Sequence, residues 1–151
     1  MTKSADVVAL ETMRWECSEG VLTLTLNRPA RLNAFNPQMG FDWFTALDRI
    51  DSEDDVRVVI VTGEGRGFCA GADLSAGADT FNPGGGNEYA EPDGPAERRD
   101  LGGRVTLRIF QCQKPIIAAV NGPAVGVGAT SILPMDIRLA STKARFGFVF
   151  S

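Results

Sequence analysis

Two glycine-rich stretches decide the fold: GEGRGFCAGADL at residues 63–74 and NGPAVGVGA at residues 121–129. Each follows a short run that is almost entirely apolar, at residues 56–61 and at residues 116–120. Such β-branched runs are too short for typical helices and predict strands that are covered on both faces. Glycine tolerates backbone conformations that other residues avoid, so each loop can turn backbone N–H groups inward. We therefore expect the two loops to carry the chemistry of the protein.

The rest of the sequence alternates between strand and helix patterns. In VLTLTL, apolar and polar residues alternate with the period of a strand, and in 39–50 the apolar residues recur at helical spacing. The predicted elements are a hairpin of 13–17 and 21–26, a helix begun by Asn36 and Pro37 that ends near Asp51, the strand 56–61, a helix at 96–112, the strand 116–120, a short helix through Leu133 and a strand at 136–140. This order predicts an α/β fold of layered sheets and helices.

Two further segments have distinctive compositions. Residues 75–95 contain three consecutive glycines, three prolines and only acidic charges, which predicts a flexible acidic loop. The helix expected at 96–112 carries four arginines, which we interpret as a solvated basic face; they are Arg98, Arg99, Arg104 and Arg108. Apart from the loop, residues 1–151 are expected to form a single domain.

The composition excludes several classes of function. The chain has 151 residues with 15 Lys and Arg against 19 Asp and Glu, so a formal net charge of -4 argues against nucleic-acid binding. It has no histidine, which excludes Ser-His and Cys-His nucleophile pairs and His-containing zinc sites. Three widely spaced cysteines indicate a reducing, cytoplasmic compartment. The sequence has neither a signal core nor a run of about 20 apolar residues, so we expect no membrane insertion.

A series of motifs is more specific than either loop alone. In chain order they are NRPARLNAF (27–35), GEGRGFCAGADL (63–74), KPIIAAVNGPAVGVGA (114–129), DIRLAS (136–141) and ARFGF (144–148). Together they resemble the crotonase superfamily, in particular the enoyl-CoA hydratases and isomerases, from about Val21 to the last residue. The resemblance implies a crotonase-like (ClpP/crotonase) α/β fold, a spiral of ββα units with two packed sheets and flanking helices.

The resemblance also implies a site. Members of the family bind acyl-CoA thioesters and hold the thioester oxygen with two backbone N–H groups while enolate charge develops on it. At the matching positions, these donors would be the N–H groups of Ala72 and Val127. Gly71, Gly126 and Gly128 would permit the backbone conformations and the close approach of the ligand. The implied CoA groove comprises Arg31, Leu32, Ala34, Ala70, Asp73 and Leu74, with Asp73 also capping the turn that follows. Arg31 either approaches a CoA phosphate or is simply solvated.

The resemblance fails at two catalytic positions. Hydratases of the family use two glutamates, and the matching positions here are Thr130 and Phe150. This pattern is similar to that of the Δ3-Δ2-enoyl-CoA isomerases, which need a single base placed a little further along the chain. Three other acids could replace the catalytic carboxylate, but we interpret each as structural. Glu64 is an exposed turn residue, Asp73 is a cap and Asp136 is a carboxylate at the start of a strand.

We therefore expect the chain to be truncated, without its carboxyl-terminal helical part, and a complete chain to assemble as a trimer or a dimer of trimers. The resemblance implies no metal and no cofactor besides the CoA of the substrate. The alternative is a non-catalytic acyl-CoA-binding or interaction protein. A thioesterase or decarboxylase of the same superfamily also remains open.

Overall fold

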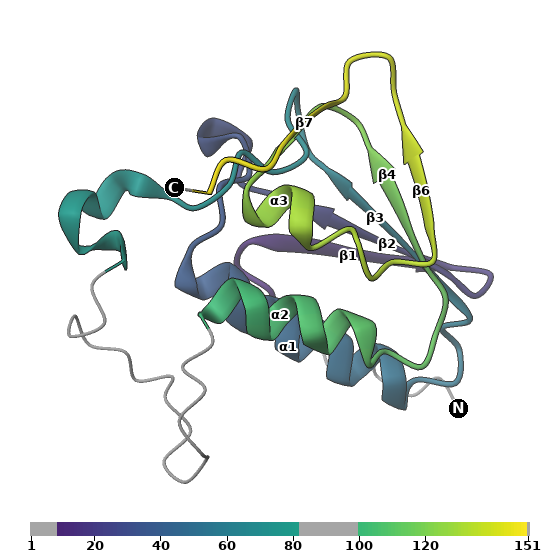
Figure 1. Cartoon of the computed structure of the whole chain (residues 1–151). Helices are drawn as coiled ribbons and strands as arrows, with labels where there is room; N and C mark the ends of the chain where they lie inside the picture. The colour runs from purple at the N-terminus through teal and green to yellow at the C-terminus, as the bar shows by residue number, and fades with distance from the viewer. Residues whose placement is uncertain (1–8, 82–99, 151) are drawn as a thin grey trace, which may run out of the picture.

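A five-stranded sheet forms the centre of the computed structural model, which describes residues 9–81 and 100–150 (Figure 1). In spatial order its strands are β1 (Met13–Ser18), β2 (Val21–Leu26), β3 (Val58–Gly63), β4 (Ile116–Val120) and β6 (Ile137–Ala140). Strand β1 is antiparallel to β2, and the other neighbouring strands are parallel. The α/β architecture expected from the sequence is therefore confirmed.

The predicted hairpin forms the first edge of this sheet. Strand β1 pairs with β2 in a register that joins Met13 to Leu26 and Ser18 to Val21. Only Glu19 and Gly20 connect the strands, with φ values of 52° and 84°. Positive φ at both turn residues matches the right-handed twist of the paired strands, so the two-residue turn fixes the register.

Helix α1 (Pro37–Ser52) begins as the sequence predicts. The side chain of Asn36 accepts a hydrogen bond from the Met39 N–H at 2.9 Å, and Pro37 occupies the first turn, where no N–H is needed. The apolar residues of the helical pattern are buried against the sheet; they include Met39, Trp43, Leu47 and Ile50. Capping and periodicity therefore suffice to place this helix.

Helix α2 (Leu101–Phe110) is shorter than the helix predicted for 96–112, of which residues 96–99 lie outside the described part of the chain. It runs beside α1 along one face of the sheet (Figure 1). One expectation for it is wrong. Arg108 is not solvated, because its guanidinium forms ion pairs with Asp48 and Asp51 of α1.

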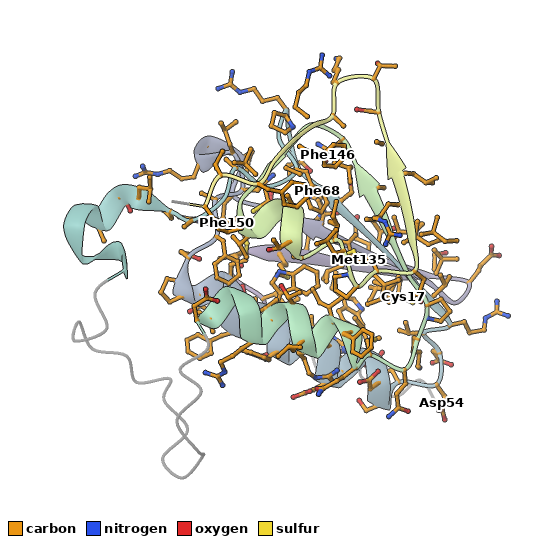
Figure 2. All side chains as sticks on the ribbon, viewed as in Figure 1. Cys17, Asp54, Phe68, Met135, Phe146 and Phe150 are labelled. Carbon is orange, nitrogen blue, oxygen red and sulfur yellow. The ribbon has the colours of Figure 1, made fainter. Side chains whose placement is uncertain are left out.

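The main core lies between the larger sheet and the two long helices, as Figure 2 shows. The register aligns Leu24, Val61 and Ala118 across three neighbouring strands, and all three are fully buried. The opposite face of β3 is less covered, since Ile60 is only partly buried. The sequence predicted strands covered on both faces, but in β3 one face is fully buried and the other is partly buried. In β6 every residue is exposed.

A second, two-stranded sheet pairs β5 (Pro123–Val125) with β7 (Arg145–Gly147) in parallel, in agreement with the two sheets expected from the resemblance. Helix α3 (Val127–Thr130) follows β5 and ends before Leu133. Two 3₁₀ helices are η1 (Pro29–Arg31) and η2 (Leu74–Phe81). The loop predicted at 75–95 begins within η2, and residues 82–99 lie outside the described chain, so that prediction is untested. Within the described ranges, no helix combines the length and apolar character needed to cross a bilayer.

The turn after β4 joins the two glycine-rich stretches. The Asn121 side chain accepts a hydrogen bond from the Gly63 N–H at 3.1 Å and donates one to the Gly65 carbonyl at 3.0 Å. Gly122 lies so close to the first loop that a Cβ atom built on it would be 2.0 Å from the Arg66 carbonyl oxygen. The two stretches are thus in direct backbone contact, which only glycine permits here.

We expect Gly122→Ala to destabilise the fold by about 3 kcal/mol, because the added methyl group meets a backbone carbonyl that cannot rotate away. Gly67→Ala in the facing loop is the matched control, since its Cβ would make only ordinary contacts, the nearest at 3.4 Å from the Leu32 carbonyl oxygen. Urea unfolding of both variants measures the difference, and equal losses of stability would contradict this description of the contact.

Candidate functional site

The two glycine-rich loops run side by side beyond the ends of the strands. The Phe68 N–H donates to the Pro123 carbonyl at 3.0 Å, and the Val125 N–H donates to the Cys69 carbonyl at 2.9 Å. These bonds place residues 68–72 along β5 and bring the predicted site residues of both loops to one place. Cys69 itself is buried there, and burial raises the pKa of its thiol, which keeps it neutral.

Glycines make this approach possible. Gly71 has a φ of 100°, and a Cβ on it would be 3.1 Å from the Val125 carbonyl oxygen. Gly126 has a φ of 54°, and its Cβ would be 3.8 Å from the Cα of Gly71. A Cβ on Gly128 would be 2.3 Å from the Cys69 carbonyl oxygen. Gly71 and Gly128 are therefore needed for close contact between the loops, whereas at Gly126 the positive φ is what favours glycine.

Two backbone N–H groups beside these glycines have no hydrogen-bond acceptor within residues 9–81 and 100–150. The amides on either side of Ala72 are engaged: the Gly71 carbonyl accepts from the Phe35 N–H at 2.7 Å, and the Asp73 N–H donates to the Phe35 carbonyl at 2.8 Å. Ala72 itself donates to no acceptor among the described residues, and neither does Val127, the first residue of α3. Both residues are partly exposed. Free donors on two contacting loops form a ready-made site for an oxygen with negative charge.

The implied groove residues divide into two groups. Leu32, Ala34 and Ala70 lie together, since the Ala70 N–H donates to the Leu32 carbonyl at 3.0 Å and Ala34 is nearly buried beside them. Arg31 is exposed and forms no ion pair within the described chain, and Leu74 is 63% exposed. These two residues face solvent, so the structure leaves both interpretations of Arg31 open.

Two residues that the sequence analysis did not assign hold the segment 28–35 against the first loop. Arg28 forms an ion pair with Asp73, with its Nη2 2.9 Å from Oδ2. Asn33 is fully buried and donates from its side chain to the carbonyls of Glu64 and Gly67, each at 2.9 Å. Both belong to the motif NRPARLNAF, but nothing local in that motif indicates these distant partners.

Asp73 caps the segment that follows it, as predicted. Its Oδ1 accepts a hydrogen bond from the Ser75 N–H at 3.0 Å, at the start of η2. Hydrogen bonding to Arg28 is the main reason that the pKa of this carboxyl falls to about 2. The carboxylate is therefore held on both sides and supports the loop, while its place in the CoA groove stays a prediction.

The other acids named in the sequence analysis have partners of their own. Glu64 pairs with Arg14 at 2.9 Å, and Asp136 accepts from the Ile116 N–H at 2.8 Å. Thr130 is partly buried and directs its hydroxyl to the Val127 carbonyl at 3.4 Å, whereas Phe150 is 67% exposed. Among residues 9–81 and 100–150, Cys, Asp and Glu nowhere gather in groups of three that could hold a metal ion.

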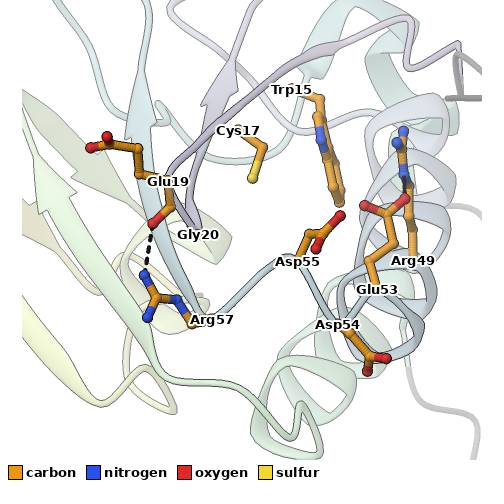
Figure 3. A pocket seen from close by; sticks show the side chains of 9 residues that line it. All are labelled: Trp15, Cys17, Glu19, Gly20, Arg49, Glu53, Asp54, Asp55 and Arg57. Atoms are coloured by element: carbon orange, nitrogen blue, oxygen red, sulfur yellow. Dashed lines mark hydrogen bonds and ion pairs between the residues drawn. The ribbon is translucent and has the colours of Figure 1, made fainter. Parts of the chain in front are cut away.

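An open hollow of about 680 Å³ lies at the other end of the parallel strands (Figure 3). It is lined by Trp15, with the Arg49 guanidinium 4.3 Å from the ring centre, and by Arg57, which donates to the Glu19 carbonyl at 2.9 Å. Two of its charged side chains, Arg49 and Arg57, therefore already have partners within the protein. This hollow lies at the amino-terminal ends of β2 and β3, whereas the glycine-rich loop 63–74 follows the carboxyl-terminal end of β3. It is separate from the candidate site.

The sequence profile described as enoyl-CoA hydratase/isomerase matches residues 16–151. The chain belongs to the enoyl-CoA hydratase/isomerase family. The resemblance expected from the motifs is thereby confirmed.

Curated proteins are similar to most of this chain. The 1,2-epoxyphenylacetyl-CoA isomerase of Escherichia coli (strain K12) is 41% identical over 140 residues, which are 88% of this chain and 48% of that protein. Enoyl-CoA hydratase ACTT3 of Alternaria alternata is 39% identical over 134 residues, 88% of this chain and 42% of its own length. The chain thus spans about half the length of these curated relatives.

Solved structures agree. An enoyl-CoA hydratase/isomerase from Xanthobacter autotrophicus Py2 superposes with a TM-score of 0.74 at 31% identity, covering 92% of this chain and 49% of that one. The enoyl-CoA hydratase EchA8_6 of Mycobacterium marinum superposes with a TM-score of 0.71 at 35% identity, covering 89% and 60%. The fold of this family member is therefore the one shared by these enzymes over the matched region.

The ion pair between Arg28 and Asp73 predicts a pH dependence of stability. Folding lowers the pKa of Asp73 from 3.8 to about 2, so the ionised carboxylate stabilises the fold fully above pH 4 and loses this effect as the pH falls towards 2. We expect Asp73→Asn, which keeps the capping oxygen, to cost about 1–2 kcal/mol at pH 7, since residual exposure to water screens the pair. Urea unfolding at several pH values should show the difference from the unmodified protein narrowing between pH 4 and pH 2. A difference that stays constant over this range would contradict the assignment.

Proposed function

We propose that this protein binds an acyl-CoA thioester with the thioester oxygen between the N–H groups of Ala72 and Val127. The observation that carries the proposal is the pair of free donors on two loops that contact each other through Gly71 and Gly126. A thioester oxygen can accept two hydrogen bonds, and two converging N–H donors match that requirement. The names of the relatives, which are enzymes of acyl-CoA, support the same substrate class.

The chemistry that such a site favours is enolate formation. Removal of a proton next to the thioester carbonyl moves negative charge onto the oxygen, and donors that are already in place stabilise this charge without reorganising. Both loops are fixed by backbone hydrogen bonds and by the amide side chains of Asn33, which is buried, and Asn121, which is partly buried. Removing one donor from such a pair typically costs about 3 kcal/mol in the transition state.

Within the family we propose double-bond isomerisation of a 3-enoyl thioester rather than hydration by two glutamates. Hydration needs one carboxylate to activate water and a second group to handle the α-carbon proton, whereas isomerisation needs one base. Thr130 stands where the resemblance places the first glutamate, and a threonine hydroxyl is no base at neutral pH. The base would be a carboxylate other than Glu64, Asp73 and Asp136, which have partners of their own.

The remaining parts of the proposal follow the resemblance. Leu32, Ala34 and Ala70 would line the groove for the CoA moiety, with no metal and no cofactor other than the CoA of the substrate. The complete protein would be a homo-oligomer in the cytoplasm, where its three free cysteines would remain reduced. The competing function is acyl-CoA binding without turnover, which Thr130 and Phe150 favour.

Assays on the protein as its source produces it separate these functions. We expect the protein to convert a 3-enoyl-CoA to its 2-enoyl isomer faster than it hydrates a 2-enoyl-CoA. The isomerisation is measured by the rise in absorbance of the conjugated thioester. Faster hydration would contradict the isomerase proposal. Tight binding of both ligands in calorimetry without any turnover would establish the non-catalytic alternative.

Val127→Pro tests the donor pair itself. Proline fits the first position of a helix, where Val127 stands, but it has no N–H. We expect turnover to fall by at least about 100-fold, because one of the two donors to the oxygen is lost. Val127→Ala is the matched control, since it removes the same side chain and keeps the donor. Equal activity of the two variants would contradict the assignment of Val127.

A further inference from the structure

The guanidinium group of Arg28 connects the segment 28–35 to the first glycine-rich loop where the two meet. Nη2 of Arg28 is 2.9 Å from Oδ2 of Asp73, and Nη1 donates to the carbonyl of Ala34. Between these two contacts lies an isolated parallel bridge that pairs Phe35 with Ala72. Ala34 precedes Phe35 and Asp73 follows Ala72, so the guanidinium spans the bridge from one chain segment to the other.

This bridge determines where the Ala72 N–H points. The carbonyl of Gly71 and the N–H of Ala72 belong to one planar trans peptide group and therefore point in opposite directions. The Phe35 N–H holds that carbonyl at 2.7 Å on the side of the segment 28–35. The Ala72 N–H is consequently turned to the other side, where it has no protein acceptor among the described residues.

The peptide group needs such an external hold. Gly71 has a φ of 100°, and glycine opposes rotation of its backbone less than any other residue. No strand or helix includes residues 71–73, and two hydrogen bonds with Phe35 hold this backbone: the Phe35 N–H donates to the Gly71 carbonyl, and the Asp73 N–H donates to the Phe35 carbonyl. Asp73 is anchored on both sides, by Arg28 and by the Ser75 N–H.

We infer that Arg28 is a positioning residue, which aims the Ala72 N–H at the thioester oxygen by clasping Ala34 and Asp73 on either side of the Phe35–Ala72 bridge. The inference rests on the proposed function for the identity of the oxygen, but not for the clasp itself. A planar guanidinium can reach a carboxylate and a carbonyl at once, whereas a lysine ammonium cannot reproduce this fork. Arg28 is well suited to the task because only 19% of its side chain is exposed.

The first test is hydrogen exchange of the Phe35 and Asp73 amides in Arg28→Lys. We expect their protection to fall at least about tenfold relative to amides in β3 and β4 of the same protein, because the bridge opens locally once the clasp is lost. Arg108→Lys is the matched control. Its guanidinium also makes two contacts, with Asp48 and Asp51, and its side chain is 18% exposed, but it joins α1 to α2 away from the bridge.

The second test measures polarisation of the thioester. A saturated acyl-CoA labelled with ¹³C at the thioester carbon is bound to each variant, and the isotope-edited infrared spectrum gives the carbonyl stretch. Hydrogen bonding to two donors lowers this frequency. We expect a smaller downshift in Arg28→Lys than in the unmodified protein and an unchanged downshift in Arg108→Lys. A role in stability alone would lower the unfolding free energy of both variants and leave both downshifts intact.

The outcomes separate the clasp from the proposed function. Undiminished protection of Phe35 and Asp73 in Arg28→Lys would overturn the inference, and so would a full downshift in that variant. If the unmodified protein shows no downshift, the proposed oxygen site is wrong, and the loss of protection alone then supports the clasp. Should Arg28→Lys fail to fold, Asp73→Asn opens the same clasp from its other end, keeps the cap on Ser75, and is judged by the same two measurements.

Discussion

Backbone contact between residues 68–72 and residues 123–128 is the constraint on which the rest of the site depends. The hydrogen bond from the Val125 N–H to the Cys69 carbonyl aligns the two segments. The glycines at 71, 126 and 128 have no side chains that would hold the segments apart. A methyl group at any of these glycines would meet the opposing loop or require a backbone conformation that other residues rarely adopt. The positions of both free N–H groups follow from this contact.

Amide side chains replace regular sheet pairing around that contact; Asn33 is buried and Asn121 is partly buried. The loop 63–74 leaves the sheet, so its carbonyls need other partners. Asn33 donates to the carbonyls of Glu64 and Gly67, and Asn121 donates to that of Gly65. A loop held at so many points is a rigid support, and rigidity is what allows fixed donors to stabilise developing charge. The same bonds therefore serve both stability and the proposed chemistry.

Local signals predicted the parts of this fold that local chemistry determines. The hairpin and the Asn36 cap depend on short-range signals, and both were predicted from the sequence. The predicted turn included Ser18, which the structure places in β1, so that Glu19 and Gly20 alone form the turn. Strands β5 and β7 were not predicted, because three residues carry too little periodicity and their pairing is set by segments far apart in the chain. The exposed β6 shows the same limit, since apolar composition alone does not say which face is covered.

The candidate site divides in the same way. The glycines and the two donor positions were named from the motifs, but the partners that hold them were not. Nothing next to Arg28 indicates that its guanidinium reaches Asp73, and nothing next to Arg108 indicates that it pairs with α1. Such pairings are created by the fold, so they become visible only once the elements are placed.

A crystal structure of the protein with a bound saturated acyl-CoA would locate the thioester oxygen relative to the two donors. We expect this oxygen to lie about 2.7–3.1 Å from the backbone nitrogens of both Ala72 and Val127. A thioester oxygen beyond hydrogen-bonding distance of either nitrogen, with the ligand well ordered, would contradict this expectation.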